Sequence, residues 1–321
     1  MKVCAACHED LPKDSYSKKQ WKVDKCQRRC KVCITNNREV QLKQPNHQNN
    51  NDTNTDEIEI IKSLDSMYLE EVEKISDEEL FKQPPPDEDC PICFLRMPIL
   101  NPTGSKYMTC CGKVICSGCC YAPVYDNQGN QVDNEKCPFC RTPKPVGKKD
   151  AVERLKKRVE KDDPIAIYSL GMYYRDGMYG YPQNHTKALE LYERASELDN
   201  ALAYCNIGYA YNNGKGVEVD KKKAQYYYEL AAMKGCMYSR HNLGLQEENS
   251  GNMDRALKHY MLAVGSGHSE SLKEIKDMYS KGKATREDYT KALQLFQEYL
   301  GEIKSPQRDE AAAFSEECRY Y

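Results

Sequence analysis

The spacing of the cysteines between residues 90 and 140 constrains this chain more than any other feature. Nine cysteines and no histidine fall in that stretch of the 321-residue sequence. Eight of them form four close pairs, which are Cys90 and Cys93, Cys110 and Cys111, Cys116 and Cys119, and Cys137 and Cys140. A two-residue gap lets both sulfurs of a pair reach one ion from a single tight turn, and eight thiolates suffice for two closed tetrahedral zinc sites. The sequence therefore predicts a zinc-binding segment.

The two outer pairs are Cys-Pro-x-Cys knuckles that bracket the inner pairs, and residues 87–145 resemble the RING finger, which recruits ubiquitin-conjugating enzymes. In that family the ligand pairs interleave. The resemblance implies one zinc ion on Cys90, Cys93, Cys116 and Cys119, and a second on Cys110, Cys111, Cys137 and Cys140. The family's usual Cys-x-His pair would end here at Lys113, whose ammonium has donors only. The Cys110-Cys111 doublet is therefore expected to supply both ligands, which leaves Cys120 as a spare, packed thiol.

The same resemblance assigns contacts with the conjugating enzyme and with ubiquitin. Ile92 and Pro138 lie at the positions that dock the enzyme, and Arg141 lies where an arginine orients the ubiquitin thioester. A flexible tail held in one posture reacts faster, so this role is orientation without a covalent intermediate. Many RING fingers carry a tryptophan between the sixth and seventh ligands, whereas this chain offers only Tyr121, Val124 or Tyr125 there.

A second cysteine module is predicted over residues 1–40. Cys4, Cys7, Cys30 and Cys33 supply four thiolates, with Cys26 and His8 as alternative ligands. Together with Leu11-Pro12, Ser17-Lys18-x-Gln20 and Arg29-Cys30 they resemble the Stc1-type zinc finger, a protein-binding adaptor. The resemblance brings the expected zinc content to three ions. The segment carries a net charge of +5, so contact with nucleic acid is an alternative to protein binding.

Residues 41–86 form a predicted linker with an acidic helix. Its first part is rich in Asn and Gln and has little to bury, which is typical of a flexible segment. Apolar residues recur at helical spacing over 58–82, and Ser76-x-x-Glu79 predicts a capping box that opens a last short helix before the prolines at 84–86. We expect this helix to lie across a neighbouring domain, or to be a partner site.

Residues 163–303 are internally periodic. The phrase Leu170-Gly171-x2-Tyr174 recurs as Ile207-Gly208-x2-Tyr211, and a Lys/Arg-Ala-x3-Tyr/Phe phrase recurs with its alanines at 188, 224, 256 and 292. These phrases resemble the Sel1-like repeat, a relative of the tetratricopeptide repeat, and imply four helix pairs stacked into a protein-binding solenoid. Candidates for its binding surface are Tyr173, Tyr209, Tyr226 and Tyr227. A connecting helix is expected within 146–162, and a polar tail over 304–321 that frays after Ser305, with Ala311–Phe314 capping the last repeat.

We therefore expect a multidomain chain in which small zinc-stapled α+β modules, the N-terminal finger and an all-cysteine RING, precede an all-α Sel1/TPR-like solenoid. Clustered cysteines predict a reducing compartment, cytoplasmic or nuclear. The sequence has no run of eighteen apolar residues, so we expect no membrane span. Two functions fit. The first is a RING-type ubiquitin ligase whose array binds the substrate. The alternative is a non-enzymatic scaffold for protein–protein interaction.

Overall fold

The computed structural model describes residues 2–3, 10–11, 75–85, 89–98, 104–122, 124–125, 131–132 and 135–320. The chain divides into two compact units, residues 1–71 and 72–321. In the first unit, strand β1 (Lys2–Val3) pairs antiparallel with β2 (Asp10–Leu11), with Lys2 opposite Leu11. The four predicted N-terminal ligands and the linker to residue 74 lie outside the described residues.

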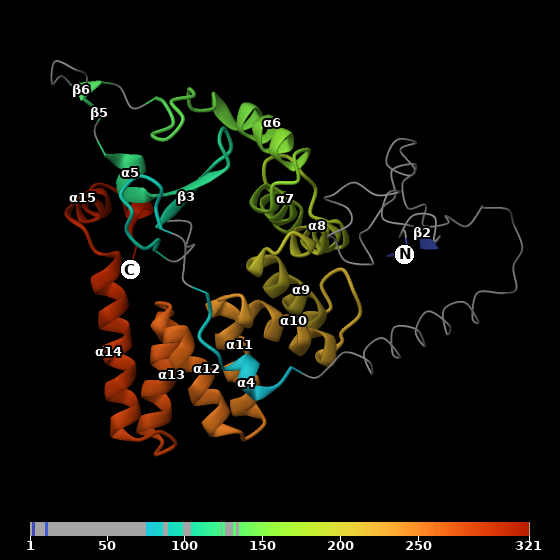
Figure 1. The fold of residues 1–321 in the computed structure, drawn as a ribbon, viewed down its shortest axis with the longest axis vertical. Coiled ribbons are helices and arrows are strands. Elements are labelled where there is room, and N and C mark those ends of the chain that lie inside the picture. The colour runs from blue at the N-terminus through green and yellow to red at the C-terminus, as the bar shows by residue number, and fades with distance from the viewer. Residues whose placement is uncertain are drawn as a thin grey trace, which may run out of the picture. The chain divides into compact units, whose positions relative to one another are not determined.

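The second unit contains the predicted array as eight consecutive helices (Figure 1). They are α7 (Pro164–Asp176), α8 (His185–Glu197), α9 (Ala201–Asn213), α10 (Lys221–Met233), α11 (Met237–Asn249), α12 (Met253–Gly265), α13 (Ser269–Ser280) and α14 (Arg286–Ile303). Local chemistry sets many of the ends. The side chains of Asp163, Asn184, Asn200 and Asp220 accept hydrogen bonds from the first turns of α7 to α10, and Gly177 and Gly214 end α7 and α9 in the left-handed conformation. The predicted all-helical solenoid is confirmed.

Glycines and tyrosines of the repeated phrases explain how each helix pair packs. A Cβ built on the repeat glycine of α7, α9 or α11 would lie 2.4 to 2.8 Å from a tyrosine ring of the next helix, for the pairs Gly171 and Tyr192, Gly208 and Tyr228, and Gly244 and Tyr260. Any side chain larger than hydrogen would push the two helices apart. The four periodic alanines are buried as well, at 0 to 2% exposure. The repeated small residues are therefore the close-contact points of the array.

A cysteine module precedes the array. It contains the antiparallel hairpin of β3 (Ser105–Met108) and β4 (Lys113–Cys116), with Ser105 opposite Cys116, followed by the short helix α5 (Ser117–Tyr121). A second small hairpin pairs β5 (Val124–Tyr125) with β6 (Gln131–Val132). The core of the module is Met97 and Ile115 packed among cysteines, so sulfur supplies much of the buried surface. Helix α6 (Gly147–Val159) occupies the predicted connecting segment.

The segment before the module carries the short helix α4 (Asp77–Leu80). The backbone N–H of Glu79 donates to Ser76 Oγ, and the backbone N–H of Ser76 lies 3.4 Å from a Glu79 carboxylate oxygen. This is the reciprocal arrangement of a capping box, so that prediction is confirmed.

The prediction of a frayed polar tail is wrong. Residues after Ser305 form helix α15 (Pro306–Phe314) and a 3-10 turn, Glu316–Cys318. Ala311, Cys318 and Tyr320 are buried, and so is the charged side chain of Arg308. The tail folds because it packs against α5 of the cysteine module, which offers it a surface to cover (Figure 1).

Candidate metal centre

The two outer knuckles have the same backbone geometry. In the first, the N–H of Cys90 donates to the carbonyl of Leu95 and the N–H of Phe94 donates to that of Cys90. In the second, the N–H of Cys137 donates to the carbonyl of Thr142, and the N–H of Arg141 donates to the carbonyl of Cys137. The residue after each second cysteine is left-handed, at φ 56° for Phe94 and 62° for Arg141. Each knuckle is therefore a tight turn that aims two sulfurs to one side.

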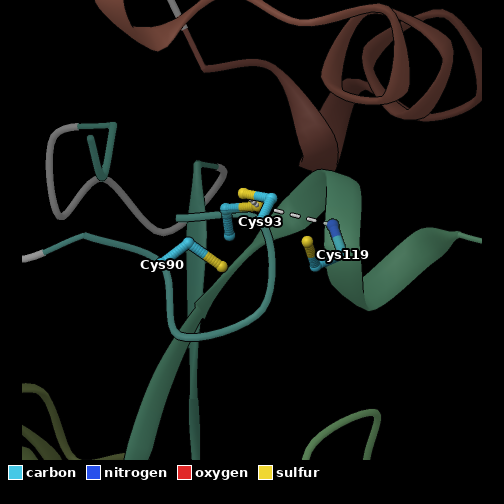
Figure 2. A group of neighbouring side chains, drawn as sticks. Cys90, Cys93 and Cys119 are labelled. Atoms are coloured by element: carbon cyan, nitrogen blue, oxygen red, sulfur yellow. Dashed lines mark hydrogen bonds between the residues drawn. The ribbon is translucent and has the colours of Figure 1, made fainter. Parts of the chain in front are cut away.

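The first sulfur group joins the first knuckle to the start of α5. Its members are Cys90, Cys93, Cys116 and Cys119, whose sulfurs all lie within 4.8 Å of one another. Figure 2 shows the side chains of Cys90, Cys93 and Cys119 turned toward a common centre. Strand β4 ends at Cys116, which is the N-cap of α5, and its sulfur accepts the backbone N–H of Cys119 at 3.4 Å.

The second sulfur group joins the hairpin turn to the second knuckle. Cys110 and Cys111 lie in the turn between β3 and β4, where Gly112 takes φ 73°, and they meet Cys137 and Cys140. The vicinal doublet places both of its sulfurs in the same group. The structure therefore brings together the eight cysteines that the sequence assigned to the two interleaved sites, four to each.

Sulfur spacing fits a tetrahedral metal. A zinc ion with four sulfurs at about 2.3 Å places neighbouring sulfurs about 3.8 Å apart. The distance is 3.8 Å from Cys93 Sγ to Cys116 Sγ and 3.9 Å from Cys111 Sγ to Cys137 Sγ, while Cys140 and Cys110 are closer, at 3.4 Å. Both groups could hold a metal ion, and four sulfurs would fill its coordination sphere.

The electrostatics of the second group also call for a cation. The hydrogen bond with the Thr142 hydroxyl, 3.2 Å away, lowers the pKa of Cys140 to about 6. Burial, together with the neighbouring sulfurs, raises the pKa values of Cys110 and Cys111. An ionised thiolate in this group therefore makes it harder for the neighbouring thiols to lose their protons. A bound divalent cation would remove this conflict, because it stabilises all the thiolates at once.

The remaining residues of the RING interpretation lie around these groups. Ile92 and Pro138 are half-buried on their knuckles and Arg141 is exposed. Cys120 belongs to neither group, and burial raises its pKa to about 12. Tyr121, a candidate for the missing tryptophan, packs its ring against Phe314 of α15 at 4.5 Å between centroids.

Arg308 anchors the module to the tail of the chain. Its guanidinium is fully buried and donates from one terminal nitrogen to the carbonyls of Arg96 at 2.9 Å and Ile303 at 2.6 Å. The other terminal nitrogen lies 3.6 Å from Cys93 Sγ. Gly118 permits this approach, since a Cβ there would lie 2.8 Å from the Arg308 side chain. A positive charge is therefore held beside the first sulfur group.

A second anchor lies at the start of the array. The hydroxyl of Tyr107 in β3 donates to Asp163, the N-cap of α7, at 2.8 Å, and Arg158 of α6 donates to the same carboxylate oxygen at 2.9 Å. Gly112 lies against this pair, because its Cβ would clash with the Arg158 guanidinium. The module thus contacts both ends of the array.

Sequence reasoning missed both anchors. Arg308 is 215 residues from Cys93, and nothing in the local spacing of the tail distinguishes it from a solvated arginine. Tyr107 and Asp163 are 56 residues apart, and no spacing in the sequence joins them. Among the four tyrosines proposed for the binding surface, Tyr209 is exposed, whereas Tyr173, Tyr226 and Tyr227 are half-buried among other rings.

Comparison with known proteins identifies the repeats. The Sel1 repeat family matches residues 164–200, 201–236 and 277–298. A curated relative is the ERAD-associated E3 ubiquitin-protein ligase component HRD3B of Arabidopsis thaliana, 32% identical over 94 residues, which are 28% of this chain and 14% of the relative. Chitin synthase regulatory factor 4 of Schizosaccharomyces pombe is 26% identical over 132 residues, or 41% of this chain and 21% of the relative. The chain thus spans at most about a fifth of the length of these relatives.

A solved structure, the Sel1 repeat protein from Oxalobacter formigenes, is 27% identical, with a TM-score of 0.40 over 51% of this chain and 64% of that chain. The helix pairs α7–α8 and α9–α10, and residues 277–298 near the end of the array, are therefore Sel1 repeats. No helix in the described part of the chain is both long enough and apolar enough to cross a membrane.

Proposed function

We propose that this chain is a non-enzymatic scaffold in which zinc holds the cysteine module against the Sel1 array, and the array binds a protein partner. Each sulfur group would take one zinc ion, and the N-terminal cysteines a third. Four sulfur ligands leave no open position for water or substrate, so such ions stabilise structure. The module has little other core, which makes the metal its main source of folding energy.

The observation that carries this proposal is the docking of α15 on α5. Many RING fingers carry a tryptophan between the sixth and seventh ligands, the region that here contains Tyr121. Here Tyr121 from that region packs against Phe314, and Gln307 of α15 approaches Cys119. This side of the module is already covered by the chain's own tail. The module uses this side to anchor the array.

Metal content and partner retention test the scaffold. We expect Cys93→Ala to lower the zinc content of the full chain by one ion, whereas Cys120→Ala leaves it unchanged, as measured by elemental analysis. Proteins cross-linked to the zinc-loaded chain in an extract of its source cells should be lost with Ala224→Arg, which disrupts the buried helix contact. They should be retained with the exposed variant Lys276→Glu. Equal retention by both variants would contradict binding through the array.

Ubiquitin ligase activity is the second candidate. It is favoured by the apolar and basic residues that the knuckles leave exposed, since Phe94 is 76% and Phe139 44% exposed, and Arg141 reaches solvent. The relative with a ligase component's name points the same way. A conjugating enzyme would then dock on the knuckles, through Ile92 and Pro138.

Single-turnover discharge of ubiquitin from a panel of charged conjugating enzymes separates the two candidates. A scaffold leaves the discharge rate unchanged for every enzyme when the chain is fully loaded with zinc. Acceleration that Ile92→Ala abolishes, and that Arg141→Lys reduces, would establish the ligase instead. Arg141→Lys is preferred to alanine because its side chain keeps the charge.

A further inference from the structure

The array already carries a peptide from its own chain. The segment around α4, residues 76–85, lies on α10 and on the helix pair that follows it (Figure 1). It makes contacts of three kinds. Leu80 is 1% exposed, the carboxylate of Asp77 forms an ion pair with Arg255 of α12, and Pro84 lies within 4 Å of the Cβ position of Gly235. Each contact comes from a side chain of the segment, as in a bound ligand.

Phe81 is held by cations. The Arg255 guanidinium carbon lies 5.3 Å from the ring centroid and Lys258 Nζ lies 5.4 Å from it, while the His259 ring is 4.7 Å away. A cation over an aromatic face is attracted by the ring quadrupole. An aromatic residue directly after a buried leucine is therefore recognised by chemistry that an aliphatic residue could not replace.

The surface beneath the segment is poorly suited to a merely structural contact. His259 is completely buried, and in the described part of the chain neither of its ring nitrogens has a hydrogen-bond partner. Arg240 of α11, whose charge acts on His259, is 2% exposed, and neither of its terminal nitrogens has a hydrogen-bond partner among the residues that the structure describes. A buried guanidinium without a partner is destabilising. Beside them, Arg255 pairs with Asp77 and lies with Lys258 over the Phe81 ring, so the cations that the segment meets match an acid followed by an aromatic residue.

Space for a longer ligand adjoins the segment. A cavity of about 1110 Å³ runs from Phe81, Pro84 and Pro85 along α12 and α14. Its walls combine apolar residues with side chains of both charges, among them Leu257, Met261, Leu295, Lys258, Lys291, Arg96, Asp89, Asp254, Asp288 and Glu302. The groove therefore continues past the residues that the segment covers, with apolar walls and charges of both signs.

We propose that the face formed by α10, α11 and α12 is a receptor for acidic peptides with the pattern acid-x-x-Leu-aromatic, and that residues 77–81 are its resident ligand. The partner is a protein segment of this pattern, which replaces the resident one. This inference deepens the scaffold function and rests on it, because it names the class of partner that the array accepts.

A fluorescein-labelled peptide with the sequence of residues 75–85 tests the proposal. The receptor is the zinc-loaded full chain with Leu80→Asp and Phe81→Ala, which should vacate the site. We expect saturable binding to this variant, at least tenfold weaker binding to the unmodified chain, and no binding of a peptide whose Leu and Phe are both replaced by Ala. In the vacated chain, Arg255→Glu with Lys258→Glu should weaken binding more than tenfold, whereas Lys276→Glu should not.

Phe81→Ala alone provides a milder vacated chain if the double variant unfolds, with the exposed Phe94→Ala as its matched control. Equal affinity for the vacated and unmodified chains would overturn the proposal, as would absence of binding to a vacated chain whose array melts normally. Dimers that exchange the segment would also overturn it, by assigning the site to a second copy. If these assays fail but Ala224→Arg still releases cross-linked partners, the scaffold function stands and only the peptide proposal is refuted. The two failures are therefore distinguishable.

Discussion

Replacing Arg308 tests the coupling between the tail and the cysteine module most directly. The Arg308→Met variant keeps a long apolar side chain in the buried site but removes the guanidinium. The carbonyls of Arg96 and Ile303 then lose the donors that now lie 2.9 and 2.6 Å away. Each buried acceptor left unsatisfied costs about 1–3 kcal/mol. The guanidinium's own desolvation cost is relieved, which offsets part of the loss.

We therefore expect α15 to lose about 3 kcal/mol of docking free energy, which corresponds to roughly a hundredfold change in an equilibrium constant. Hydrogen exchange followed by mass spectrometry measures this locally. Amides of α15 and α5 should exchange about a hundredfold faster under conditions in which exchange follows the opening equilibrium. Amides of α7 to α10, in the first half of the array, should keep their rates.

Two further variants calibrate the result. Arg308→Lys retains the charge but cannot reproduce the forked donors, so it should fall between the native chain and the methionine variant. Arg319→Met removes an exposed arginine from the same tail and should change nothing. Less than threefold acceleration in α15 with Arg308→Met would refute the anchoring role, and so would equal acceleration throughout the array.

Helix packing, titration and the second anchor supply three other tests. Gly244→Ala should destabilise the array by about 1–3 kcal/mol in urea unfolding because its Cβ meets a tyrosine ring at 2.4 Å, whereas Gly301→Ala, with open space around it, should be neutral or slightly stabilising. Burial, and then nearby arginine charges, lower the pKa of His259 to about 3, so below pH 6.5 the unfolded chain binds more protons than the folded one. The free energy of unfolding should therefore fall by about 3 kcal/mol between pH 6.5 and 4. For His259→Leu this fall should be smaller by the same amount. Tyr107→Phe removes the hydrogen bond to Asp163 and should cost about 1 kcal/mol in thermal unfolding, a result contradicted by an unchanged midpoint.

Short-range patterns allowed much of this structure to be predicted. The array followed from glycine and alanine phrases, because every repeat must solve the same packing problem within about 36 residues. The capping box at Ser76 followed from two side chains three residues apart. The two sulfur groups followed from the interleaved order of the cysteine pairs, given the resemblance to a known module.

The contacts that assemble these parts are long-range and could not be predicted. A tail with few apolar residues gives no reason to expect a helix, since the surface that stabilises α15 lies on α5, almost 200 residues earlier in the sequence. Arg308 is typical of an exposed residue until carbonyls from two other segments surround it. In the same way, the aromatic ring of Phe81 gains its cations only when α12 is brought beside it.

Contacts at both ends of the array change how it can bend. A solenoid whose repeats touch only their neighbours bends by adding small rotations along its length, and its ends are free to separate. Here the cysteine module contacts Asp163 before the first repeat and Arg308 after the last. The module therefore fixes the distance between the two ends of the array. The curvature of the groove then depends on one folded module of about sixty residues. If the two sulfur groups hold zinc as proposed, removing it would free the two ends of the array, and a ligand that requires a different curvature would have to distort the zinc-bound module.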